Sequence, residues 1–137
     1  MTQEDKQLLI KDLCARLPYG TYVHHKNVPD TKFKVIAVFD DGRIGVTENE
    51  IPLTPTSINE CKPYLRSMSS ITMEEIRYKL SKFFKIINTN IEGIGYVPTL
   101  NSGSAIEYIN WLNEKHFDYN GLIEKGIALE APDGMYE

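Results

Sequence analysis

The sequence predicts an α+β fold in a single domain of 137 residues. Two observations carry this prediction. Segments with helical hydrophobic spacing occur near the N-terminus and twice in the C-terminal half, and short β-branched and aromatic runs bounded by turn residues lie between them. We therefore expect residues 1–66 to form a helix and a small antiparallel sheet. Residues 67–137 should form a helical half with two amphipathic helices and an acidic tail.

The N-terminal helix is expected to begin after Thr2, whose hydroxyl can cap a free backbone N–H group, and to end at Pro18. Its apolar face consists of Leu9, Ile10, Leu13, Cys14 and Leu17. The polar residues Lys6, Lys11, Asp12 and Arg16 fall mostly on its other sides. Cys14 is therefore interpreted as a small core residue rather than a reactive thiol, because the sequence fixes no His or Lys beside it.

Strand patterns follow at residues 21–25, 33–39 and 43–46, separated by turn residues. The Asp41-Gly42 pair predicts a tight hairpin with positive φ at both central positions. A weaker strand at 51–53 contains Pro52 and therefore belongs at an edge. Strands of this length favour a small curled sheet, with an SH3-like, barrel-like arrangement as one alternative. Residues 55–66 are interpreted as the connection to the next helix.

The second helix is expected over residues 73–87, where Thr72 and Glu75 have the spacing of a capping box. Its apolar stripe contains Met73, Ile76, Leu80, Phe83, Phe84 and Ile87, and its far side carries Arg77, Lys79, Lys82 and Lys85. Residues 88–103 are typical of a loop, with a candidate strand at 94–97.

The third helix is expected to begin at Ser104, which has capping-box spacing to Glu107. Its apolar face contains Ala105, Tyr108, Ile109, Leu112 and His116. Gly121 and Gly126 suit left-handed backbone after helical turns. The tail 131–137 is expected to be extended or frayed.

The sequence lacks the motifs of several functional classes. The N-terminus has no secretory signal pattern and no apolar run is long enough to cross a bilayer, so we expect a cytoplasmic protein without membrane contact. Two cysteines are too few for a disulfide scaffold or a zinc site.

His24 and His25 are adjacent on a strand and point to opposite faces. His116 is interpreted as a satisfied, partly buried histidine or as a cation near a helix C-terminus. We therefore predict no cofactor, no metal and no enzymatic activity.

Charge and aromatic residues mark two candidate binding surfaces. The net charge is −4, yet residues 103–137 carry seven acids against two bases, while residues 62–85 are basic. The residues Trp111, Phe117, Asp118 and Tyr119 form a candidate protein-interaction surface, with Trp111 also open to interpretation as a core-edge residue. The residues Arg77, Lys79, Lys82 and Lys85 are candidate phosphate contacts, although an amphipathic helix needs a polar exterior in any case.

Segments at both ends and in the middle of the chain carry a family resemblance. They are residues 1–5 and 11–20, the central 62–70 (KPYLRSMSS), and the closing 111–113, 116–126 and 128–132. These segments resemble a family of small proteins of unknown function that recur in gut-anaerobe genomes, often in prophages and other mobile elements. The family often has Pro where Ser67 stands and Arg where Asn120 stands. The resemblance implies a mobile-element context and no catalytic residues.

The leading hypothesis is a non-enzymatic protein-interaction module of phage or mobile-element origin, with a protein partner. The alternative is a nucleic-acid-binding accessory protein that uses the basic face of helix 73–87, although a pI of about 5.4 argues mildly against it. A cryptic enzyme with a deep polar pocket is a third hypothesis.

Overall fold

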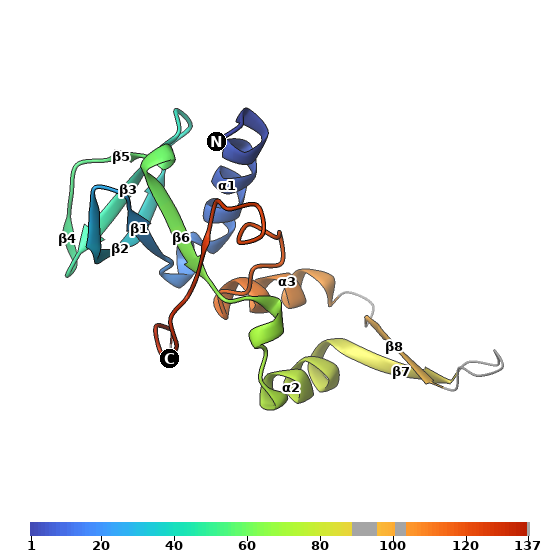
Figure 1. Ribbon diagram of the computed structural model, residues 1–137. Helices are drawn as coiled ribbons and strands as arrows, with labels where there is room; N and C mark the ends of the chain where they lie inside the picture. The colour runs from blue at the N-terminus through green and yellow to red at the C-terminus, as the bar shows by residue number, and fades with distance from the viewer. Residues whose placement is uncertain (89–95, 101–103, 137) are drawn as a thin grey trace.

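The α+β class is confirmed by a computed structural model, which describes residues 1–88, 96–100 and 104–136 and, within 85–88 and 96–98, only the backbone. The helices are α1 (Gln3–Arg16), α2 (Met73–Phe83) and α3 (Ala105–Glu114), with short 3₁₀ helices η1 (Leu17–Tyr19), η2 (Ile58–Glu60) and η3 (Met68–Ser70). The strands are β1 (Tyr22–His25), β2 (Val28–Val38), β3 (Arg43–Glu48), β4 (Ile51–Pro52), β5 (Thr56–Ser57), β6 (Cys61–Leu65), β7 (Phe84–Asn88), β8 (Tyr96–Leu100) and β9 (Leu129–Glu130). Figure 1 shows α1 beside the main sheet, with α2, α3 and the β7–β8 hairpin extending away from it.

The main sheet has the order β4-β3-β2-β1-β6-β9, with β5 also paired to β3. All these pairs are antiparallel except β6 with β9. The expected edge position of Pro52 is confirmed, since it lies in β4. The interpretation of 55–66 as a connection is wrong, because β6 returns beside β1 with Val23 opposite Pro63. Pro63 lacks a backbone N–H, which weakens the strand pattern in the sequence.

The capping prediction for α1 is confirmed, since the Asp5 backbone N–H donates to Thr2 Oγ1 at 3.0 Å. Its predicted apolar face is partly wrong. Cys14 is exposed, and Asp12 and Arg16 are fully buried. The buried face contains Leu9, Asp12, Leu13 and Arg16, which have the i, i+3, i+4, i+7 spacing of one helix side. The helix therefore turns a charged pair toward the core, and Cys14 points away from it.

The β2–β3 turn differs from expectation. At the β2–β3 turn only Gly42 has positive φ (86°), and its N–H donates to the Phe39 carbonyl at 3.2 Å. Asp41 keeps ordinary backbone, so the loop is longer than a two-residue turn. The two-residue turn lies instead between β3 and β4, where Asn49 (φ 48°) and Glu50 (φ 67°) both have positive φ.

The predicted capping box of α2 is confirmed by reciprocal bonds between Thr72 and Glu75. The helix ends at Phe83 rather than at 87, because Phe84 adopts extended backbone and the aromatic and β-branched run that follows pairs with β8. The strand candidate at 94–97 lies partly outside the described residues, and β8 begins at Tyr96. The second capping box is wrong, since the Ser104 side chain caps nothing in the described chain.

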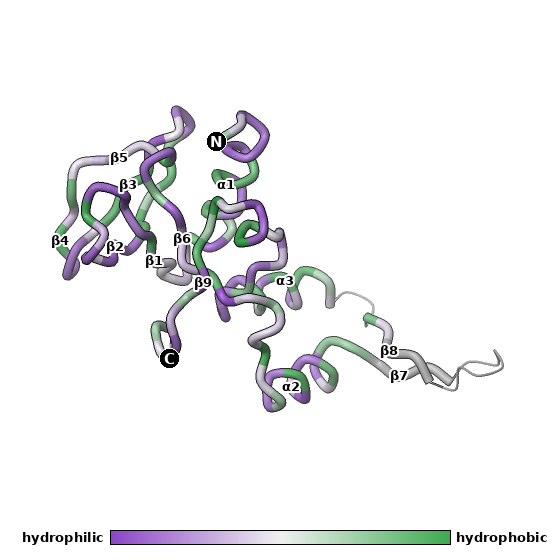
Figure 2. Tube along the Cα trace, in the orientation of Figure 1, coloured by the Kyte–Doolittle hydropathy of each residue, from purple (hydrophilic) through white to green (hydrophobic). Residues whose placement is uncertain are grey.

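Among the described residues, two hydrophobic clusters form the core. Figure 2 shows α1 and α2 alternating between hydrophobic and hydrophilic residues along their turns. The first cluster packs α1 on the sheet and includes Leu9, Leu13, Val23, Phe33, Ile44 and Leu65. The second lies between α2 and α3 and includes Phe83, Trp111, Leu112 and Phe117. Among the described helices, none has the length and apolarity to cross a membrane.

Candidate functional site

The segment after α3 folds back onto α1 and β6 instead of forming an exposed surface. Phe117 and Asp118 are 0% and 8% exposed, and Tyr119 is half-buried. The Arg66 N–H donates to the His116 carbonyl and the Asp118 N–H to the Arg66 carbonyl, which attaches the segment to the end of β6. The expectation of an exposed surface at these positions is therefore wrong, because tertiary pairing turns their side chains inward.

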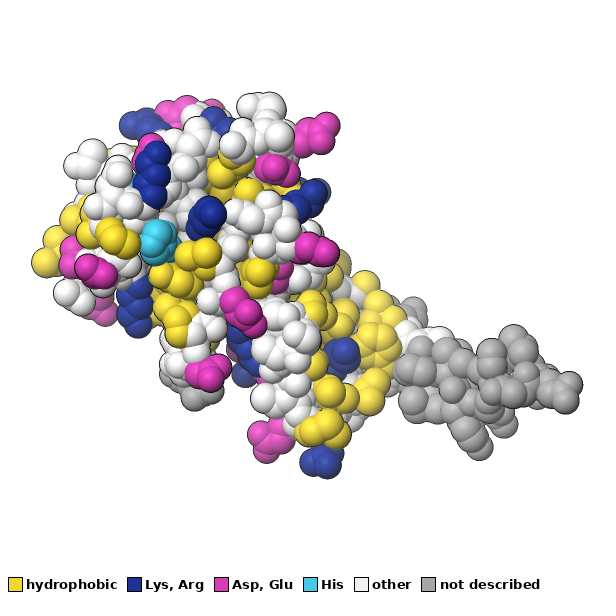
Figure 3. Space-filling view, viewed as in Figure 1, with side chains coloured by type: hydrophobic (Ala, Val, Ile, Leu, Met, Phe, Trp, Pro, Cys, Tyr) yellow, Lys and Arg dark blue, Asp and Glu magenta, His cyan; other side chains and the backbone are white. Residues whose placement is uncertain are grey.

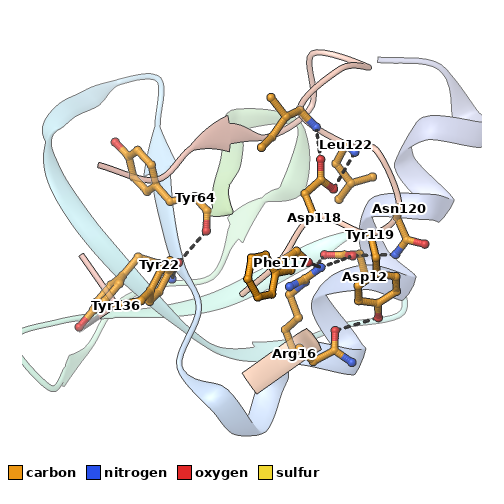
Figure 4. Close-up of polar contacts among 12 residues, drawn as sticks. Asp12, Arg16, Tyr22, Tyr64, Phe117, Asp118, Tyr119, Asn120, Leu122 and Tyr136 are labelled. Atoms are coloured by element: carbon orange, nitrogen blue, oxygen red, sulfur yellow. Dashed lines mark hydrogen bonds and ion pairs between the residues drawn. The ribbon is translucent and has the colours of Figure 1, made fainter. Parts of the chain in front are cut away.

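A buried polar network fixes this segment to α1 (Figure 4). Arg16 Nε donates to Asp12 Oδ2 at 2.8 Å, and both side chains are fully buried. Arg16 Nη2 also donates to the Phe117 carbonyl at 2.6 Å, and Asn120 Nδ2 donates to Asp12 Oδ1 at 2.8 Å. Because a buried charge is costly unless it is paired and hydrogen-bonded, this network explains why α1 can bury two charged residues.

Asp118 has a structural role in the next turn. Its two carboxylate oxygens accept the backbone N–H groups of Leu122 and Ile123 at 2.8 and 2.9 Å (Figure 4). Gly121 and Gly126 then adopt left-handed backbone, with φ of 71° and 78°, which confirms their prediction. The acidic residue thus satisfies backbone donors, as a capping residue does.

Trp111 belongs to the core edge, one of the two interpretations left open by the sequence. It is 6% exposed, and its ring lies 5.7 to 5.9 Å from the rings of Tyr78, Phe83 and Phe117. Such ring distances are typical of packed aromatic pairs. Trp111 therefore supports the contact between α2 and α3 rather than presenting a free face.

His116 is the most perturbed histidine of the described chain. It lies beyond the end of α3 with φ 62°, is 5% exposed, and stacks on Tyr136 at 3.6 Å. Burial, together with smaller effects of the nearby Arg16 and Arg66 charges, lowers the pKa of His116 to about 4. The interpretation of His116 as a cation is therefore wrong, and its Nδ1 has no hydrogen-bond partner in the described part of the chain.

The tail is anchored rather than frayed. The Tyr136 hydroxyl donates to the Tyr64 carbonyl at 2.7 Å and accepts the Tyr22 N–H at 3.0 Å (Figure 4). Burial raises the pKa of this phenol. The aromatic tail residue thus connects two strands of the sheet to His116.

Two adjoining hollows lie where α2, α3 and the tail meet, with volumes of about 670 and 510 Å³. We call them together the acidic hollow, because their lining includes Glu74, Glu75, Glu114, Glu130 and Asp133. Arg66 forms a bidentate pair with Glu75 at 2.7 and 2.8 Å, and this hydrogen bonding lowers the Glu75 pKa to about 2. The smaller hollow also contacts Tyr78 and Trp111, so carboxylates and aromatic rings share one concave surface.

The candidate phosphate contacts do not form one helical face. Lys79 and Lys82 are three residues apart on α2, but Arg77 is two residues from Lys79 and points to another side. Lys85 lies in β7, and its side chain is outside the described residues. The early end of α2 at Phe83 thus separates Lys85 from the helix.

Two further observations concern metal binding and thiol chemistry in the described residues. Across residues 1–88, 96–100 and 104–136, no three His, Cys, Asp or Glu side chains converge in a way that could hold a metal ion. Cys61 is buried, and its burial raises the pKa of its thiol to about 11, which disfavours the reactive thiolate.

Sequence reasoning missed the network of Asp12, Arg16 and Asn120. The i, i+4 spacing of Asp12 and Arg16 was the one local feature of the sequence that could have indicated this ion pair. Comparison of the chain with protein families, with curated proteins and with solved structures found no significant match.

Proposed function

We propose that this chain is a non-enzymatic protein-interaction module of phage or mobile-element origin. Its binding region is the surface formed by exposed apolar side chains of α2 and α3, together with the acidic hollow beside them. We call the apolar part the α2–α3 surface, which consists of Met73, Tyr78, Leu80, Ile106 and Ile109. The family resemblance of the sequence supports the proposed origin.

The exposure of these apolar side chains is the observation that carries the proposal. Ile106 is 76% exposed and Met73 62%, although both lie on helices whose other sides are packed. Figure 3 shows hydrophobic side chains gathered over this part of the molecule. Large apolar side chains that are exposed at the surface favour protein contacts, because their burial against a partner removes apolar area from water.

The acidic hollow supports a particular kind of partner. Glu74 and Glu114 line both of its parts and form none of the ion pairs found among the described residues. Charge complementarity favours a segment that combines a Lys or Arg side chain with apolar residues. The cation would lie near the carboxylates and the exposed ring of Tyr78, which suits a cation–π contact.

The buried titratable groups support the non-enzymatic part of the proposal. Asp12, His116 and Asp118 lie in the interior, and Asp12 and Asp118 use their oxygens for internal hydrogen bonds. A general acid or base must reach a substrate proton, which these side chains do not.

The test is capture of a partner with the immobilised chain, followed by direct titration of the purified partner. A Met73→Glu, Ile106→Glu variant should lose the partner, because two charges would enter an apolar contact. The matched control is Ile51→Glu, Val28→Glu, which places the same charges on exposed positions of the sheet. Retention of the partner by the α2–α3 variant, or equal loss in the control, would contradict the proposed surface. Trp111→Ala is unsuitable here, since the residue is part of the core.

Nucleic-acid binding through Arg77, Lys79, Lys82 and Lys85 stays the alternative proposal. The Lys79→Ala, Lys82→Ala variant described in the next subsection tests this alternative, because it removes the two lysines that share a side of α2.

A further inference from the structure

The outer face of the main sheet has a different character from its inner face. Along β1 and β2 the side chains alternate, with Val23, Phe33 and Val35 buried in the core that α1 covers. The intervening residues of the same strands point to the other face. We call this the outer face, and it contains Tyr22 and His24 of β1, Lys32, Lys34 and Ile36 of β2, and Lys62 and Tyr64 of β6.

Basic side chains lie next to one another across three strands of this face. His24 is directly opposite Lys32 on one side and Lys62 on the other. Lys34 is opposite Tyr22 on the next row. Paired residues point to the same face, so Lys32 and Lys62 flank His24 on this face. Lys32, Lys34 and Lys62 form none of the salt bridges found among the described residues. Their positive charges are therefore available to an anionic ligand.

Aromatic rings lie among these bases. Lys32 Nζ lies 4.4 Å from the centre of the Tyr22 ring, and Lys34 Nζ lies 5.8 Å from it. The other neighbours of this face are rings too, since Tyr136 stacks on Tyr22 at 5.6 Å and His24 meets Tyr64 edge-on at 6.3 Å. The lysines are thus held close to aromatic surface by cation–π attraction.

A hollow of about 610 Å³ opens beside Tyr22. Its lining is Tyr22, Lys32, Lys34, Ile36, Thr47, Asn49 and Glu50. This volume falls within the range of small-molecule sites, which is about 300–1,000 Å³. In Figure 3 the sheet half shows Lys or Arg side chains around a histidine, with hydrophobic-class side chains beside them.

We infer that the outer face binds single-stranded nucleic acid. Lys32, Lys34 and Lys62 contact successive phosphates, while bases enter the hollow beside Tyr22. A basic surface with interleaved aromatic rings is the combination that single-strand binders use, because every base has a face that can stack. Duplex DNA fits less well, since a helix or a two-stranded ribbon must enter its major groove. This face belongs to the main sheet, which lies apart from α2 and α3 (Figure 1), and the inference does not rest on the function proposed above.

Glu50 offers a gain-of-affinity test at the rim of the hollow. Its carboxylate is on the lining, where it opposes a phosphate, and its φ of 67° is unfavourable for a residue with a side chain. The substitution Glu50→Gly removes the negative charge and suits this backbone conformation. We expect it to tighten oligonucleotide binding without loss of folding.

The main experiment is fluorescence anisotropy of a labelled oligothymidylate with the full chain at several salt concentrations. We expect the Lys32→Ala, Lys34→Ala variant to weaken binding by roughly tenfold or more at low salt, and the salt slope to fall by about 1.4, or about 0.7 for each lost phosphate contact. The matched control, Lys79→Ala, Lys82→Ala, removes the same charge from α2 and should leave the affinity unchanged. Thermal melting of each variant checks the fold.

A labelled polyglutamate peptide and a DNA duplex distinguish the possible ligands. Weaker binding of both than of the single strand supports the inference. Equal binding of polyglutamate would show a general anion-binding face and overturn the nucleic-acid assignment. The inference is also overturned if the oligothymidylate fails to bind, or if the α2 control weakens binding as much as the β2 variant does. A Glu50→Gly variant that binds no better would exclude the hollow from the site.

Discussion

Two regions of the molecule differ in what they bury. The sheet region, formed by α1, β1–β6 and residues 116–136, buries charged and polar groups and pairs them with one another. The helical region, formed by α2 and α3, is held together by an aromatic core. Large apolar side chains are exposed in both regions, among them Ile51 on the sheet and Ile106 on α3. The difference between the regions therefore lies in their interiors, where one depends on a charged network and the other on packed rings.

The largest expected effect is in the buried network of the sheet region. Asp12→Ala leaves the Arg16 guanidinium buried without its carboxylate, and breaking such a pair from one side costs about 3–5 kcal/mol. The free energy of unfolding, measured by urea denaturation, should fall by that amount. Glu124→Ala is the control, because it removes an acidic side chain that is exposed.

A double variant separates the charge penalty from simple loss of packing. If Asp12→Leu, Arg16→Leu is more stable than Asp12→Ala, the cost arises from the unpaired guanidinium. A small effect of Asp12→Ala would contradict the contrast between the two regions, since the network would then contribute little to the sheet region.

The second prediction concerns acid sensitivity of the sheet region. His116 has a pKa of about 4 in the folded chain, against 6.5 as its ordinary value. The unfolded chain therefore binds a proton more readily below pH 6.5, and stability present above that pH is lost as pH falls toward 4. We expect the free energy of unfolding to fall by about 2–3 kcal/mol between pH 7 and pH 4.5.

The comparison for this prediction is His116→Phe, which keeps a ring for stacking on Tyr136 but cannot take up the proton. Its free energy of unfolding should change less over the same pH range. Glu75, whose pKa is about 2, titrates mainly below this window, because its stabilising charge is lost only as pH falls from 4.5 toward 2. Equal pH dependence of the two proteins would show that His116 is not the acid-sensitive group.

The sequence predicts well those features that depend on a few neighbouring residues. Thr72 and Glu75 form their capping box within one helical turn, and Gly121 adopts its left-handed backbone locally. The amphipathic patterns and short strands also give the α+β class. These features need no knowledge of distant contacts, because their hydrogen bonds and dihedral angles are set within a few residues.

Features that depend on distant partners were harder to predict. Arg16 can be buried because the Phe117 carbonyl accepts a hydrogen bond from its Nη2 atom. The two residues are far apart in the sequence. Phe117 is likewise buried because the segment after α3 pairs with Arg66. An aromatic and acidic segment has the composition of an interface, but the same composition serves a polar network that joins two parts of a fold. The candidate surface at Phe117 and Asp118 failed for this reason. Met73, Leu80 and Ile109 were expected on apolar helix faces and lie partly in solvent.

The smallest expected effect is on the α2–α3 surface and sharpens the contrast most directly. Met73→Gln and Ile106→Gln replace side chains that are 62% and 76% exposed, so each should change the free energy of unfolding by about 0.5 kcal/mol or less. Urea denaturation of each variant measures this. Leu9→Gln is the contrasting change, since Leu9 is fully buried and its loss would place an unpaired amide in the core. If Ile106→Gln destabilised the chain by several kcal/mol, its side chain would serve folding, and the α2–α3 surface would lose its main support as a binding site.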